Sequence, residues 1–136
     1  GVLQVGPARL ADVICFEVAY DGVVRDAVRG GGRLVVVQTN NATFGHSGET
    51  SQQLAMGRLR AVETGRAVVV AATSGVSAVI QPDGRVTARS RVFTRDLLVQ
   101  RVPLRSAQTP ATRLGALPEY LLALLGLGAA VAGARR

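Results

Sequence analysis

Residues 13–37 read VICFEVAYDGVVRDAVRGGGRLVVV and contain two short apolar runs on either side of a helix-like pattern. The first run, residues 13–16, is bounded by polar residues and predicts a buried strand. Asp21 is the expected N-cap of a short helix, which the glycines at 30–32 end. The second run, residues 34–37, is rich in valine and predicts another buried strand. Strand, helix and strand in this order imply a parallel pair with a crossover helix.

The chain after residue 37 continues with a loop, a helix and a strand. Residues 39–48 are rich in Asn, Gly, Ser and Thr and predict the loop. The TSQQ sequence at 50–53 fits a capping box at the start of a helix, and Gly65 stands where that helix would end. Residues 68–72 (VVVAA) predict a third buried strand.

A β-hairpin is expected next. Residues 76–80 and 85–89 flank Pro82-Asp83-Gly84, which is a strong turn sequence. Residues 96–102 predict one more strand, and residues 106–112 predict a linker.

The C-terminal segment is different in character. Between residues 114 and 134 the only charged residue is Glu119. A membrane-spanning helix needs about 20 apolar residues. The segment reaches that length if Glu119 lies at the interface, with Tyr120 as an aromatic anchor. The alternative is an amphipathic or buried domain helix, but the segment lacks the polar face of such a helix. The residues favour a membrane span.

The charge pattern gives little support for nucleic-acid binding. All 16 basic residues are arginines, and the net charge is +7. The arginines from Arg9 to Arg113 are scattered singly, without interleaved aromatic residues, which favours a solvated basic surface. A single cysteine excludes an internal disulfide framework and a multi-cysteine metal site.

Cys15 is the candidate nucleophile, because it follows a predicted buried strand. Sites in α/β sheets form at the carboxyl ends of strands, although a free cysteine is also often a buried core residue. Glu17 would point the same way as Cys15 if the strand continued, and would orient the nucleophile's partners or pair with an arginine. The glycine-flanked loop around His46 gives no support for a Cys–His pair.

Six motifs in order resemble the bacterial apolipoprotein N-acyltransferases, the membrane branch of the nitrilase superfamily. The first is Ile14-Cys15-Phe16-Glu17. The others are residues 24–26 (VRD), 39–45 (TNNATFG), 54–63 (LAMGRLRAVE), 74–80 (SGVSAVI) and 109–113 (TPATR). Two positions depart from the family's usual residues: Phe16 stands where Tyr is frequent, and Thr43 where Trp is usual.

The resemblance implies an α/β (α+β) fold, the C-terminal part of a nitrilase-like αββα sandwich, followed by a C-terminal transmembrane helix. Residues 1–113 would belong to the catalytic domain, and residues 114–136 would form the membrane helix and a short cytoplasmic tail. The family uses a Glu-Lys-Cys triad, in which Cys15 would be the nucleophile. Its Glu and Lys lie upstream of the cysteine and have no counterpart here, so the chain is expected to begin partway through the domain.

The implied reaction is a two-step acyl transfer without a metal or another cofactor. Cys15 would take an acyl chain from a phospholipid as a thioester and pass it to the diacylglyceryl-modified cysteine of a lipoprotein. The backbone N–H of Phe16 would stabilise the oxyanion, with Glu17 in support. Glu63 is expected to be buried or half-buried near the Cys15 strand, held by an arginine such as Arg60 or Arg66. The location would be the bacterial inner membrane, with the catalytic domain on its outer face and the C-terminus in the cytoplasm.

Two other functions are compatible with the same residues. A soluble nitrilase-type amidase or carbamoylase would share the Cys15 site but would lack the membrane span. A non-catalytic fragment would contain Cys15 only as a structural residue.

Overall fold

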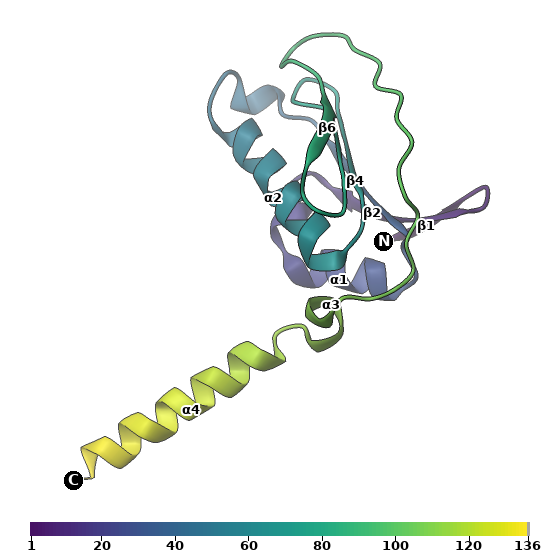
Figure 1. The fold of residues 1–136 in the computed structure, drawn as a ribbon. Helices are drawn as coiled ribbons and strands as arrows, with labels where there is room; N and C mark the ends of the chain where they lie inside the picture. Colours follow the sequence, from purple (N-terminus) through teal and green to yellow (C-terminus); the bar gives the residue numbers. More distant parts are fainter. Residues whose placement is uncertain (136) are drawn as a thin grey trace.

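The computed structural model describes residues 1–135 and contains one mixed six-stranded sheet with strand order β1-β2-β3-β4-β5-β6. Its central strands, β2 (Ala8–Ile14), β3 (Leu34–Thr39) and β4 (Val68–Ala72), are parallel. Helices α1 (Asp21–Arg29) and α2 (Glu49–Thr64) connect them (Figure 1). The predicted crossover unit is therefore present, and the helix and strand predicted after it form a second one.

The core lies between the central strands and the two helices, which also contact each other. Alternate valines of the strands face this side, and α1 and α2 turn their apolar residues toward them. The fully or nearly fully buried members include Val13, Val35, Val37, Val68, Val70, Val24, Val28 and Ala61. The hydrophobic effect of this layer holds the carboxyl ends of the three strands side by side.

The outer strands are antiparallel. β1 (Val2–Val5) pairs with β2, and β5 (Ala78–Ile80) and β6 (Val86–Arg89) form the predicted hairpin beside β4. The prediction of a strand at residues 96–102 is wrong, because these residues have no regular structure. Leu97 and Val99 are 84% and 79% exposed, so this apolar segment joins no sheet.

Two helix starts differ from the predictions. Asp21 is the first residue of α1, and Tyr20 occupies the N-cap without a side-chain hydrogen bond. Arg25 donates to Asp21 at 2.5 Å and lowers the pKa of that carboxyl group. Helix α2 begins at Glu49 rather than at a capping box formed by residues 50–53. Its end is as expected, since Gly65 has φ 64°.

Residues 91–109 run without regular structure from the hairpin to α3 (Pro110–Leu114), which occupies part of the predicted linker. Residues 91–114 together form what we call the return segment. Arginine side chains hold it in place by donating hydrogen bonds to its backbone carbonyls. Arg33 donates to Leu104, Arg66 donates to Ala107, and Arg29 donates to Thr112 and Arg113.

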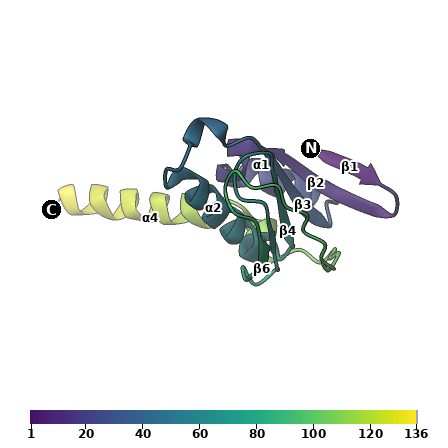
Figure 2. The same cartoon turned by 90° about the horizontal axis from the view of Figure 1, so that it is seen from above.

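The last helix, α4 (Leu117–Ala134), projects away from the sheet and its covering helices (Figures 1 and 2). It has no buried residue. Its length and mean hydropathy of 1.6 are sufficient for a helix that crosses a membrane. The predicted apolar C-terminal helix is thus present.

Candidate active site

Cys15 lies at the junction of β2 and a short 3-10 helix, η1 (Cys15–Ala19). Its φ is 52°, which is uncommon for a residue other than glycine. The chain therefore turns sharply between strand and helix. This strand–turn–helix geometry resembles the arrangement by which α/β-hydrolases expose a nucleophile above a sheet.

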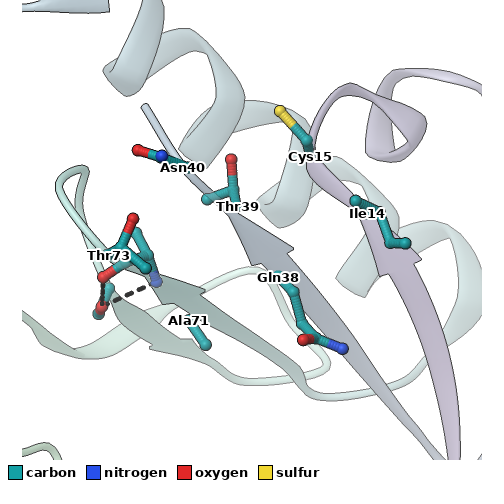
Figure 3. Close-up of a pocket in the computed structure, with 9 residues that line it drawn as sticks. Ile14, Cys15, Gln38, Thr39, Asn40, Ala71 and Thr73 are labelled. Atoms are coloured by element: carbon teal, nitrogen blue, oxygen red, sulfur yellow. Dashed lines mark hydrogen bonds between the residues drawn. The ribbon is translucent and has the colours of Figure 1, made fainter. Parts of the chain in front are cut away.

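The Cys15 thiol lines a cleft of about 630 Å³ at the carboxyl ends of the parallel strands (Figure 3). Ile14 and Cys15 come from the end of β2, Gln38–Asn40 from the end of β3, and Ala71–Thr73 from the end of β4, with Ser77 beside them. Parallel strands bring their carboxyl ends to one edge, where sites in α/β sheets form. The position predicted for Cys15 is the position it occupies.

A buried chain of polar side chains lies behind Cys15. The Thr39 hydroxyl donates to Asn41 Oδ1 at 2.6 Å, and Asn41 Nδ2 donates to Gln53 Oε1 at 2.7 Å. Gln53 Nε2 in turn donates to Cys15 Sγ at 3.8 Å. Sequence reasoning missed this group, because it assigned Gln53 to a local capping box.

Phe16 and Glu17 have different surroundings. As an early residue of a 3-10 helix, Phe16 has a backbone N–H without an acceptor inside that helix. Its ring packs edge-on against Tyr20. The strand does not continue to Glu17, so the condition for Glu17 to point the same way as Cys15 is not met. Glu17 lies in η1, and its carboxylate accepts the Ile14 N–H at 2.7 Å. Its contact therefore closes the turn at the end of β2.

Glu63 pairs with Arg60, and Arg60 in turn contacts η1. The two side chains form an ion pair and are only 17% and 9% exposed. Arg60 also donates to the carbonyls of Val18 and Ala19, each at 2.9 Å. Glu63 is therefore mostly buried and paired with Arg60, and Arg60 fixes the end of η1.

The remaining candidates do not gather at the cleft. The ring of His46 packs against Phe93, with 5.2 Å between centroids. Within residues 1–135, no group of three or more His, Cys, Asp or Glu side chains is placed to hold a metal ion.

Comparison with known proteins agrees with this geometry. The family model described as carbon-nitrogen hydrolase matches residues 2–111. The chain belongs to the carbon-nitrogen hydrolase family. Among curated relatives, an apolipoprotein N-acyltransferase of Mycolicibacterium smegmatis is 39% identical over 127 residues, which are 93% of this chain and 21% of that protein. The chain spans between a fifth and about a quarter of the length of the curated relatives it matches.

Solved structures of the nitrilase superfamily share the fold. A branch 10 member from Saccharomyces cerevisiae has a TM-score of 0.58 at 17% identity, over 70% of this chain and 38% of that chain. An amidase mutant from Nesterenkonia sp. AN1 has a TM-score of 0.54 at 28% identity, over 68% and 37% of the two chains. The sheet and its helices thus form part of a nitrilase fold, as expected from the resemblance.

Proposed function

We propose that this chain is the C-terminal part of an apolipoprotein N-acyltransferase, in which Cys15 carries the acyl group. The observation that supports this most is the sharp turn at Cys15, which places the half-buried thiol at a cleft at the carboxyl ends of β2, β3 and β4. The similarity to an apolipoprotein N-acyltransferase over 93% of the chain favours this chemistry over other members of the family. Residues 1–113 would form part of the catalytic domain, and residues 114–136 a membrane anchor.

The first step would transfer an acyl chain to the enzyme. The Cys15 thiolate attacks the ester carbonyl of a phospholipid, and a tetrahedral oxyanion forms. The N–H of Phe16, the residue after the nucleophile, would stabilise the oxyanion. Collapse of the intermediate breaks the ester C–O bond, forms a thioester, and releases a lysophospholipid once its alkoxide gains a proton. An acid–base group must remove the thiol proton and then protonate this alkoxide. The chain has no lysine that could do so.

The second step would consume the thioester. The free α-amine of the diacylglyceryl-cysteine of a lipoprotein attacks the thioester carbonyl, and the amine loses a proton. The Cys15 thiolate leaves as the amide forms. A thioester suits this step because a thiolate is a much better leaving group than an alkoxide. Both substrates are lipid-anchored, and the exposed apolar helix α4 is consistent with a membrane location.

An amidase or carbamoylase is the second candidate. The Nesterenkonia structure shows covalent addition of an acetamide moiety at the active-site cysteine of that enzyme. Cysteine chemistry on small amides therefore occurs on this fold. The two candidates differ in substrate, because an amidase would need neither a phospholipid nor a membrane helix.

The test is the Cys15→Ser variant of the full-length protein, incubated with phospholipid vesicles and separately with small amides. Serine keeps the size of the side chain but needs far stronger activation than a thiol. We expect mass spectrometry to find an acyl adduct on Cys15 of the wild-type protein, and acyl transfer to vanish in the variant. Full activity of Cys15→Ser would refute the proposal. Turnover of amides, with no acyl group taken from phospholipid, would favour the amidase.

A further inference from the structure

The polar chain behind Cys15 joins three separate parts of the fold. Thr39 ends β3, Asn41 follows it in the loop, and Gln53 lies one turn into α2. The three residues are only 7%, 2% and 5% exposed. Polar groups at such depth are costly unless each finds a partner.

The hydrogen bonds run in one direction along these three side chains, from Thr39 toward Cys15. A threonine hydroxyl has one proton. Thr39 Oγ1 lies 2.6 Å from Asn41 Oδ1 and 3.3 Å from Gln53 Oε1, so the nearer Asn41 oxygen is its main acceptor. The amide nitrogen of Asn41 then faces Gln53 Oε1, so Gln53 must present its own nitrogen on the other side. That nitrogen lies 3.8 Å from Cys15 Sγ and donates to it.

Gly75 leaves the space that this arrangement needs. A Cβ atom at residue 75 would lie 2.8 Å from Asn41 Cγ and 2.9 Å from Asn41 Cβ. Such separations are closer than van der Waals contact, so any larger residue would displace Asn41. The loop after β4 therefore fits around the polar chain.

We propose that Gln53 is a positioning residue that stabilises the Cys15 thiolate, and that Asn41 and Thr39 fix the orientation of the Gln53 amide. This inference rests on the proposed role of Cys15 as nucleophile. An N–H group donates a stronger hydrogen bond to an anion than to a neutral acceptor, so the amide favours the thiolate over the thiol. A purely structural polar cluster would affect stability but would leave the ionisation of Cys15 unchanged.

The test measures alkylation of Cys15 by iodoacetamide as a function of pH in the full-length protein, with the modified Cys15 peptide quantified by mass spectrometry. Iodoacetamide forms an S–C bond with the thiolate and releases iodide, so the rate reports the thiolate fraction. Gln53→Met keeps the side-chain length and removes the donor. We expect alkylation about tenfold slower near neutral pH, the size of one hydrogen bond to a charged group. The two rates should converge at about pH 10, where an ordinary thiol is ionised.

Matched variants separate the donor's effect from general disturbance. Gln52→Met makes the same change at the exposed neighbouring residue and should leave the profile unchanged. Thr39→Val should move the profile in the same direction as Gln53→Met, whereas Thr39→Ser keeps the hydroxyl and should restore the wild-type profile.

Two results would overturn the inference. One is a wild-type pH profile for Gln53→Met, and the other is the same loss in Thr39→Ser as in Thr39→Val. Circular dichroism identifies a variant that fails to fold. Unfolding would expose Cys15, so it would not produce slower alkylation that is confined to neutral pH. Alkylation requires neither phospholipid nor lipoprotein. A shifted profile without an acyl adduct would therefore refute the acyltransferase and leave the role of Gln53 intact.

Discussion

Cys15 is held in its positive-φ conformation by bonds from both sides of the turn. Glu17 accepts the N–H of Ile14 at the end of β2, and Arg60 holds the carbonyls at the end of η1. A backbone in this region costs about 1–3 kcal/mol and persists where its surroundings determine it. Such a turn presents the thiol in one orientation, as a nucleophile requires.

Glu63→Gln should destabilise the protein and loosen this turn. The substitution removes the charge that compensates the buried Arg60 guanidinium. We expect a loss of about 1–3 kcal/mol in the free energy of unfolding, because a buried charge without its partner is costly. Urea denaturation of the variant measures the loss. Asp83→Asn is the control, since its pair with Arg85 is exposed and worth less than about 1 kcal/mol. Equal losses in the two variants would contradict the role given to Glu63.

The position of Cys15 was predictable from the sequence, whereas its neighbours were not. A buried strand leaves a local apolar run, and residues 13–16 indicated a strand end near Cys15, although the strand itself ends at Ile14. Gln53 contacts Cys15 across 38 residues of sequence. Local spacing carries no information about such a contact, and the same residue also fits a capping pattern. Glu17 was misplaced because the strand ends one residue before Cys15.

At the scale of elements, periodicity succeeded where one face of an element is buried. β3 and β4 alternate buried and less buried valines, and their prediction followed from that burial. β1 was missed because three of its four residues are exposed and it pairs only at the sheet edge. Residues 96–102 carry apolar side chains that no strand covers, so their composition misled the prediction.

The return segment depends on Arg66, and Arg66→Ala should weaken its attachment. Arg66 is 1% exposed and donates to the carbonyls of Gly32, Thr64 and Ala107. Burial, with Arg105 and Arg33 nearby, lowers its pKa. The substitution leaves several buried carbonyls without a donor, and we expect a loss of about 2–4 kcal/mol in unfolding free energy.

Hydrogen exchange measures the effect of Arg66→Ala locally. The amides of residues 104–113 should exchange faster in the variant, while those of β3 change less. Arg89→Ala is the matched control, since Arg89 is exposed on β6. Uniform acceleration across the domain would show that Arg66 supports the core and not this segment.

At the scale of the whole molecule, the cleft and the last helix lie toward opposite ends of the sheet. Cys15 follows the carboxyl end of β2, whereas Arg66 and Gly32, which adjoin the return segment, precede the amino ends of β4 and β3. Helix α3 packs against α1 and α2, and α4 follows it. The helix that would enter the membrane therefore does not line the cleft. In the proposed enzyme, other segments must bring the acyl donor to Cys15.

The 136-residue chain by itself should be inactive. The proposed mechanism needs a lysine beside the nucleophile, and the sequence contains none. We expect the purified chain in detergent to release no more lysophospholipid than its Cys15→Ala version. Release above that level would show that Cys15 can be activated by residues within this chain alone.

The final prediction concerns the orientation of α4. We expect the helix to cross the membrane with its C-terminus in the cytoplasm and the Cys15 domain outside. Arg135 and Arg136 follow the helix directly, whereas Glu119 and Arg113 lie at its other end. Basic residues concentrate on the cytoplasmic side of membrane helices, so this arrangement favours a cytoplasmic C-terminus. The glycines at 126, 128 and 133 have open space around them, and such small residues allow close packing of neighbouring membrane helices.

Thiol labelling in intact spheroplasts tests this orientation. The full-length protein would carry Cys15→Ala, no other native cysteine, and one new cysteine after Arg136. A membrane-impermeant maleimide should label this cysteine only after the membrane is opened. A matched protein with its cysteine at exposed Thr87 on β6 should be labelled in intact spheroplasts, because the predicted topology places the Cys15 domain outside. Labelling of the C-terminal cysteine in intact spheroplasts would reverse the topology. Labelling of both cysteines would show that α4 does not cross the membrane.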